Sequence, residues 1–255
     1  MNVELLQYNP DCEKIVAAAA KLCYSSSPID GILDDLDEEK TEKFLNRLMS
    51  MGHESPTEHV YFTFGIEGVS RSLLAQITRH RIASYSVKSQ RYVKEGQFEF
   101  ITPPEIEAIP EAKEEFLKAM AEDVASYNKL SDILFEKHYN NMLSSGMSEK
   151  AAKTAAEKKA IEDARYILPN ACETKMIVTM NTRSLVNFFH HRCCERAQWE
   201  IRDLACRMLS LVKEVSPTLF KYAGPRCLLG KCPEGAMSCG KMLEKRKMFL
   251  GETNE

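Results

Sequence analysis

The stretch Val60-Tyr-Phe-Thr-Phe-Gly-Ile-Glu67 alternates apolar and polar side chains, and this alternation decides the fold class. One side of the stretch carries Val60, Phe62, Phe64 and Ile66. The other side carries Tyr61, Thr63 and Glu67. A period of two residues is typical of a strand whose sheet has one buried face, which is the usual arrangement in antiparallel sheets. The stretch therefore predicts a half-buried antiparallel strand.

Helical patterns lie before and after this strand in the sequence, and helices and strands do not alternate regularly. Apolar spacing and capping residues predict helices over 11–23, 38–51, 70–77, 110–146, 148–167, 183–190 and 195–215. Further strands are expected near 91–94, 98–102 and 175–181. Strands scattered among helices favour an α+β class. We expect a single domain with a mostly antiparallel sheet packed with helices, plus a long helical segment. The catalytic domain would span 1–222, and 223–255 would be a tail of unknown role.

Bulk properties narrow the class of protein. The chain has 255 residues, 44% of them hydrophobic and 28% charged, with a net charge of −3. It begins with a polar, acidic stretch and has no apolar run near the ~20 residues that a membrane span needs. Its nine cysteines are irregularly spaced, which favours reduced thiols. We expect a cytoplasmic protein with no membrane role and no general affinity for nucleic acid.

A first cationic segment runs from Gly68 to Lys94. Six of its 27 residues are Arg or Lys, and none is a carboxylate. Arg79-His80-Arg81 falls where a helix should end, and Ser84, Ser86 and Ser89 follow it. Guanidinium groups, hydroxyls and loop amides together suit a phosphate or diphosphate. A solvated basic turn is the alternative, but such turns usually intersperse acids among their bases.

A second cationic segment runs from Asn181 to Arg202. On a helix, Arg183, Asn187, His190 and His191 would share one side. Arg192 would instead fall among apolar residues, where an unpaired charge is very costly. Either the helix breaks near His191, or Arg192 enters a pocket that holds an anionic group. A third alternative is that its stem packs on the core while its head reaches water.

These motifs resemble those of the flavin-dependent thymidylate synthases. The match includes Arg79-His80-Arg81 followed after seven residues by Ser89, and it covers roughly residues 1–222. It continues through Gly52-His53-Glu54-Ser55-Pro56, Asn181-Thr182-Arg183-Ser184-Leu185 and Ala197-Gln198-Trp199-Glu200. The resemblance implies reductive methylation of dUMP to dTMP. Methylenetetrahydrofolate would donate the carbon, and FAD reduced by NADPH would donate the hydride, in a homotetramer whose sites combine several subunits.

The resemblance also implies site residues. FAD would contact His53, Ser55, Arg79, His80, Arg81, Asn181, Arg183 and Asn187. The substrate dUMP would contact Gln76, Arg79, Ser89, Arg91, Arg165 and Arg192. Arg192 would face the uracil ring; as it is too basic to remove a proton, its role would be to stabilise negative charge developing on the ring.

Some features depart from the family pattern or lie outside it. Ser86 and Val87 replace an Asn and an acid of many members, and Arg196 replaces a His of some, which puts individual flavin contacts in question. We read Cys193-Cys194 as packing cysteines. Cys227, Cys232 and Cys239 are spaced too irregularly to indicate zinc strongly, so we expect no metal and a loosely ordered, reduced tail. A nucleic-acid-binding strip at 68–94 and a zinc-dependent module in the tail remain the rival hypotheses.

Overall fold

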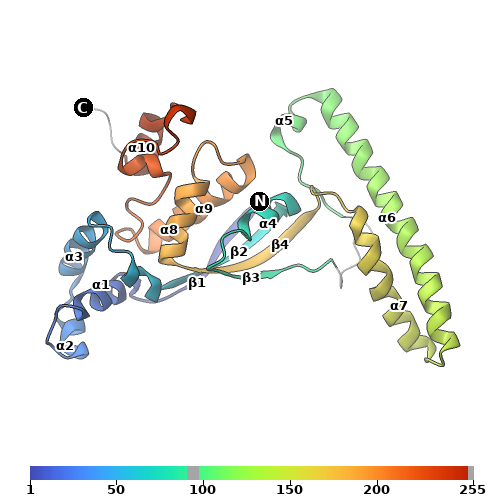
Figure 1. Ribbon diagram of the computed structural model, residues 1–255, viewed down its shortest axis with the longest axis horizontal. Coiled ribbons are helices and arrows are strands. Elements are labelled where there is room, and N and C mark those ends of the chain that lie inside the picture. Colours follow the sequence, from blue (N-terminus) through green and yellow to red (C-terminus); the bar gives the residue numbers. More distant parts are fainter. Residues whose placement is uncertain (91–97, 252–255) are drawn as a thin grey trace. The chain divides into compact units, whose positions relative to one another are not determined.

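The structure is a computed structural model that describes residues 1–90 and 98–251 (Figure 1). Its strands are β1 (Asn2–Tyr8), β2 (Tyr61–Ser70), β3 (Ser84–Val87) and β4 (Glu173–Asn181). They form one sheet in the order β1-β2-β4-β3, in which β1 and β2 pair antiparallel. The α+β class with an antiparallel sheet is therefore confirmed. The strand expected near 91–94 lies outside the described residues, and Phe100 makes only an isolated bridge with Cys172.

The helices follow the expected pattern closely. The α-helices are α1 (Cys12–Leu22), α2 (Ile29–Asp34), α3 (Glu38–Ser50), α4 (Arg71–Ile77), α5 (Pro104–Glu107), α6 (Pro110–Ser144), α7 (Glu149–Ala164), α8 (Thr182–Arg192), α9 (Trp199–Val215) and α10 (Met242–Leu250). Short 3-10 turns are η1 (Ser55–His59), η2 (Arg165–Ile167), η3 (Arg226–Leu229) and η4 (Gly235–Met237). Among the described residues, no helix combines the length and apolar character that crossing a bilayer requires.

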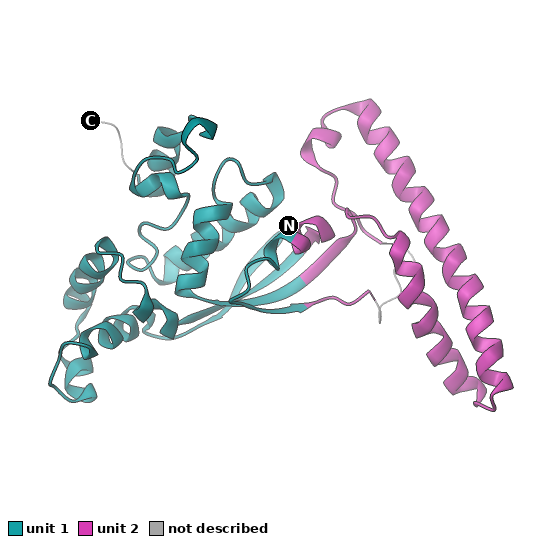
Figure 2. Cartoon of the chain, in the orientation of Figure 1, with its two compact units in different colours: residues 1–67, 76–86, 176–255 teal, residues 68–75, 87–175 magenta. Residues whose placement is uncertain are grey.

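The chain divides into two compact units (Figure 2). The first comprises 1–67, 76–86 and 176–255, and the second comprises 68–75 and 87–175. The sequence predicts one domain, and the boundary between these units was not predicted. The proposed division at residue 222 stays a prediction, and the tail belongs to the first unit.

The core of the first unit forms on the apolar face of β2. Phe62 is fully buried and meets the ring of Phe220 edge-on, with 5.3 Å between the ring centroids. Phe220 in turn meets Phe189 of α8 at 6.0 Å. The opposite face of β2 is more polar and more exposed to solvent. Tyr61 is exposed there, and the hydroxyls of Thr63 and Thr179 lie 2.9 Å apart. The alternation in sequence therefore becomes one face for the core and one for solvent.

The second unit consists mainly of two consecutive helices, α6 and α7, which pack on each other as an antiparallel hairpin. Ala152, Ala156, Ala160 and Ala164 form a buried stripe along α7. These residues repeat every four positions, so they lie on one face of the helix. Small side chains let the two helices approach closely, and α6 contributes the fully buried Tyr127. This packing explains the long helical segment that the sequence predicts.

Candidate active site

The N-terminus of α8 is fixed where β4 ends. The Asn181 side-chain oxygen accepts a hydrogen bond from the Ser184 backbone N–H at 2.8 Å. This is an N-cap, which satisfies one of the helix's free N–H groups. Leu185, Phe188 and Phe189 then face the core and are fully buried. The cap and the buried face together fix the direction of α8 and place its last residue, Arg192.

Arg192 connects the two cationic segments. Its Nε donates to Nε2 of His80 at 3.1 Å, and its Nη2 donates to the carbonyl oxygen of Gln76 at 3.4 Å. The helix does not break before Arg192 but ends at it, and the side chain is half-buried. Residues 116 positions apart thus meet in one unit. The helix break near His191 is therefore excluded, whereas an anionic group bound at Arg192 stays a prediction.

His80 supports Arg192 from the first segment. Its ring meets Phe188 edge-on at 5.0 Å. Burial, followed by the charges of Arg192 and His191, lowers the pKa of His80 to about 4. At neutral pH the imidazole is therefore uncharged, and its Nε2 is free to accept the hydrogen bond from Arg192. The aromatic contact and the hydrogen bond hold the guanidinium in a single orientation.

Tyr85 fixes the turn that carries Arg79-His80-Arg81. Its hydroxyl lies 2.8 Å from the carbonyl oxygen of Ile77 and 2.9 Å from that of His80. Burial raises the pKa of Tyr85 to about 12, so the hydroxyl stays protonated and can donate. Tyr85 thereby ties β3 to the carbonyl groups at the end of α4.

A cavity of about 740 Å³ opens beside Arg192. Residues of both cationic segments and of the tail line this cavity. Among the lining residues are the cations Arg79, Arg192, Arg196, Arg226 and Lys245, the carboxylates Glu195 and Glu234, and the polar residues His80, Asn187, His190 and His191. All of them belong to the first unit.

The carboxylates of the cavity are already paired. Glu195 binds Lys245 at 2.6 Å, and Glu234 binds Arg196 at 3.2 Å. Within the described residues, the Arg79 side chain has no hydrogen bond or ion pair. The pKa of Arg192 is lowered, first by the burial of its own side chain and then by the positive charge of Arg79. Two cations held near each other with no offsetting carboxylate favour an anionic ligand.

The tail forms the remaining wall of this cavity and is more ordered than the sequence analysis expected. Arg196 Nη1 donates to the carbonyl oxygen of Met237 at 2.6 Å. Arg246 donates to the carbonyl oxygens of Cys227 at 3.1 Å and Gly230 at 2.9 Å. The prediction of a loosely ordered tail is therefore wrong. Polar contacts hold these turns, and such contacts leave no apolar periodicity in the sequence from which the order could be predicted.

The other residues predicted to hold FAD are placed differently. Arg183 pairs with Glu54 at 3.4 Å and also with Glu58. His53 lines a separate cavity of about 110 Å³ with His190 and Tyr222. Asn181 uses its side chain as the helix cap, while Ser55 and Arg81 are exposed. Of the predicted FAD residues, the cavity therefore brings together Arg79, His80 and Asn187.

The residues predicted to hold dUMP are divided between the units. Gln76, Arg79 and Arg192 lie in the first unit. Ser89 and Arg165 belong to the second, where Arg165 Nε donates to the carbonyl oxygen of Glu162 at 3.1 Å. Arg91 lies outside the described residues. Arg226 and Lys245 in the cavity lining were not predicted, because their only signal was their charge in a segment assigned to a separate tail.

Comparison with known proteins gives a consistent result. The family described as Thymidylate synthase complementing protein matches residues 4–218. A protein of Clostridium tetani named flavin-dependent thymidylate synthase is 59% identical over 250 residues, which are 98% of this chain and 97% of that protein. Proteins of the same name from Geobacter sulfurreducens and Nitratidesulfovibrio vulgaris are 47% and 41% identical over 251 and 253 residues. These matches cover 98% and 96% of this chain and 98% and 97% of those proteins.

The resemblance seen in the motifs is thus confirmed along nearly the whole chain. With the convergence of Arg79, His80 and Arg192 in one cavity, the conclusion is that the chain belongs to the thymidylate synthase complementing protein family.

Proposed function

We propose that this chain is a flavin-dependent thymidylate synthase that converts dUMP to dTMP. Methylenetetrahydrofolate supplies the carbon, and NADPH supplies the reducing equivalents through FAD. The observation that carries the proposal is the contact of Arg192 with His80 and Gln76, beside the Arg79 guanidinium, which has no partner in the part of the chain that the structure describes. This contact joins the two motifs in which the resemblance to the family lies.

The cavity suits a flavin dinucleotide. An FAD molecule carries a diphosphate, and the cavity supplies guanidinium groups whose charge is not neutralised by carboxylates within the described residues. Arg79 and Asn187 would hold the diphosphate and its neighbouring groups by charge-assisted hydrogen bonds. When bound, the reduced flavin supplies the hydride that completes the methyl group.

Arg192 has the properties needed to bind and polarise the uracil ring. It is half-buried and held by His80, so its guanidinium is oriented before the substrate arrives. A fixed cation in a site that excludes much of the water stabilises negative charge as it develops on the pyrimidine. Neutral His80 leaves that positive charge undiminished, whereas a carboxylate in its place would neutralise it.

The remaining assignments belong to the assembled protein. We place it in the cytoplasm as a homotetramer in which different subunits complete each site. Ser89, Arg91 and Arg165 contribute to dUMP binding in that assembly, and His53, Ser55, Arg81, Asn181 and Arg183 contribute to FAD binding. The ion pairs of Arg183 with Glu54 and Glu58 then have to exchange for contacts with the ligand.

The reaction itself is the first test. The purified protein should be yellow, and NADPH should bleach it under anaerobic conditions. In D₂O with methylenetetrahydrofolate and NADPH, dUMP should become dTMP that carries deuterium in its methyl group, as measured by mass spectrometry, because the hydrogen on N5 of the reduced flavin exchanges with solvent before transfer. A colourless protein that binds polynucleotide in a salt-sensitive way and forms no dTMP would overturn the proposal in favour of nucleic-acid binding.

Substitution of Arg192 tests its role. Arg192→Ala should retain flavin absorbance but lower the rate of dTMP formation about 100-fold to 1,000-fold, the usual effect of removing one charge-stabilising group. Arg207→Ala is the matched control, because Arg207 pairs only with Asp203 on the exposed side of α9 within the described residues. Full turnover by Arg192→Ala would contradict the assigned role.

A further inference from the structure

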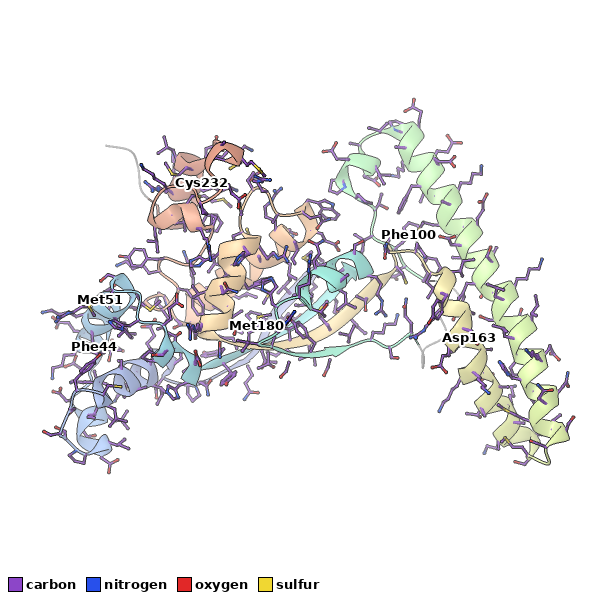
Figure 3. All side chains as sticks on the ribbon, in the orientation of Figure 1. Phe44, Met51, Phe100, Asp163, Met180 and Cys232 are labelled. Carbon is purple, nitrogen blue, oxygen red and sulfur yellow. The ribbon has the colours of Figure 1, made fainter. Side chains whose placement is uncertain are left out.

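Four cysteines surround one side of the cavity. Cys194 lies in the loop between α8 and α9, and Cys227, Cys232 and Cys239 lie in the tail. All four line the same cavity, and none forms a disulfide. Figure 3 marks Cys232 in this part of the tail. The sequence grouped only the three tail cysteines as candidate metal ligands and favoured a packing role for Cys194, because Cys194 is far from them along the chain.

The four thiols differ in burial. Cys227 is buried, Cys194 and Cys232 are half-buried, and Cys239 is exposed. All four line one cavity, although Cys194 is far from the others along the chain. The fold therefore brings Cys194 together with the three irregularly spaced cysteines of the tail.

The tail has polar contacts but no apolar core to hold its fold. From Leu229 to Gly251, all of which the structure describes, no residue is buried. The segment nevertheless contains η4 and α10, with Gly235 at φ 55° and Gly240 at φ 77°. Small folded segments without an apolar core usually depend on a disulfide or a metal ion. Because these thiols form no disulfide, a metal ion is the means of this kind that the four cysteines suit.

We infer that Cys194, Cys227, Cys232 and Cys239 together bind one Zn²⁺ ion in a closed tetrahedral site. Four thiolate ligands with no open position are typical of structural zinc. Each thiol releases its proton to solvent as its bond to zinc forms. Within the described residues, no three His, Cys, Asp or Glu side chains are arranged so that they could hold a metal ion without moving. The sulfur atoms must therefore close around the ion, and the tail can adjust because it has no buried side chains.

The surrounding charges suit this ion. A zinc ion with four thiolates carries net negative charge, which Arg226 in the same cavity wall would offset, whereas Arg196 and Lys245 already pair with Glu234 and Glu195. The ion would join the loop after α8 to the tail. It would thereby keep Arg226 and Lys245 in the cavity without taking part in the reaction itself.

Metal content tests the inference independently of catalysis. The full-length protein, purified without a metal-affinity tag and dialysed against a weak chelator, should retain about one zinc per chain. Cys232→Ser and Cys239→Ser should lower zinc affinity by more than about 100-fold, because even changes around metal ligands cost about 10-fold to 100-fold. Cys23→Ser is the matched control, since Cys23 is exposed and lies outside the cavity lining; it should retain zinc.

Zinc-edge X-ray absorption on the wild-type protein keeps the test decisive even if a variant fails to fold. The expected result is four sulfur neighbours at about 2.3 Å. In addition, removing zinc should increase amide hydrogen exchange across 229–251, and adding zinc back should reverse the increase. The inference is overturned by zinc-free wild-type protein, by nitrogen or oxygen ligands, by an iron–sulfur centre, by disulfides among these cysteines, or by equal zinc retention in all variants.

Discussion

The cavity beside Arg192 has two walls that are built in different ways. On the α8 wall, fully buried Phe188 and Phe189 lie behind His80 and Arg192. On the tail wall, Arg226 and Lys245 lie on a segment in which nothing after Leu228 is buried within the described residues. The first wall is fixed by the apolar core, and the second by polar contacts. A site can therefore be preorganised on one side and depend on salt, protonation or a bound ion on the other.

The largest expected effect comes from truncating a side chain behind the α8 wall. Phe188 is fully buried, so Phe188→Ala should lower the free energy of unfolding by about 3–5 kcal/mol. It should also leave His80 without its aromatic support. Met248→Ala in the tail is the control: 65% of the residue is exposed, and the change should stay within about 0.5 kcal/mol. Urea denaturation measures both, and equal losses would contradict the contrast between the walls.

A smaller effect is expected where the tail begins. Gly224 has φ 147°, and a Cβ there would lie 2.6 Å from Cδ1 of Leu228 and 3.2 Å from Cδ1 of Phe249. Gly224→Ala should therefore cost about 1–3 kcal/mol, the usual cost of overpacking. Hydrogen exchange followed by mass spectrometry should show faster exchange in 225–250, with α8 unchanged. Gly230→Ala, which meets nothing within 4 Å, is the matched control. Faster exchange in α8 instead would show that the walls are not independent.

The smallest effect concerns the protonation of His80. Its pKa in the folded protein, about 4, lies below the ordinary 6.5. The contribution of the neutral ring to stability is therefore complete above pH 6.5 and is lost as the pH falls towards 4. Because the ring is only half-buried, solvent screening keeps this contribution small. NMR titration of His80 should give a midpoint near 4; a midpoint near 6.5 would show that Arg192 and Phe188 do not enclose the ring.

Much of the fold was predictable because the decisive segments have strong periodicity. The two-residue alternation of 60–67 became β2, and the helical pattern of 110–146 became α6. The strand β1 was missed because its burial is weak and its pattern irregular; only its pairing with β2 makes it a strand. The helix α10 was missed because it buries no residue, so its sequence carries no amphipathic signal.

The site was predictable where it depends on local chemistry. The position of Arg192 on an apolar face left a pocket as one of several alternatives, and the structure places Arg192 in the lining of a cavity. Asn181 could have been recognised as an N-cap, since Asn before a helix commonly has that role. The ion pair of Arg183 with Glu58 could not, because it joins residues 125 positions apart. The same limit applies to the contribution of Arg226 and Lys245 to the cavity.

The most direct test of the central claim is a crystal structure of the assembled protein with FAD and dUMP bound. It should show the guanidinium groups of Arg79 and Arg192 within hydrogen-bonding distance of the bound nucleotides, with Arg192 still supported by His80. Both guanidinium groups facing bulk solvent in every subunit, with the nucleotides bound elsewhere, would contradict the account.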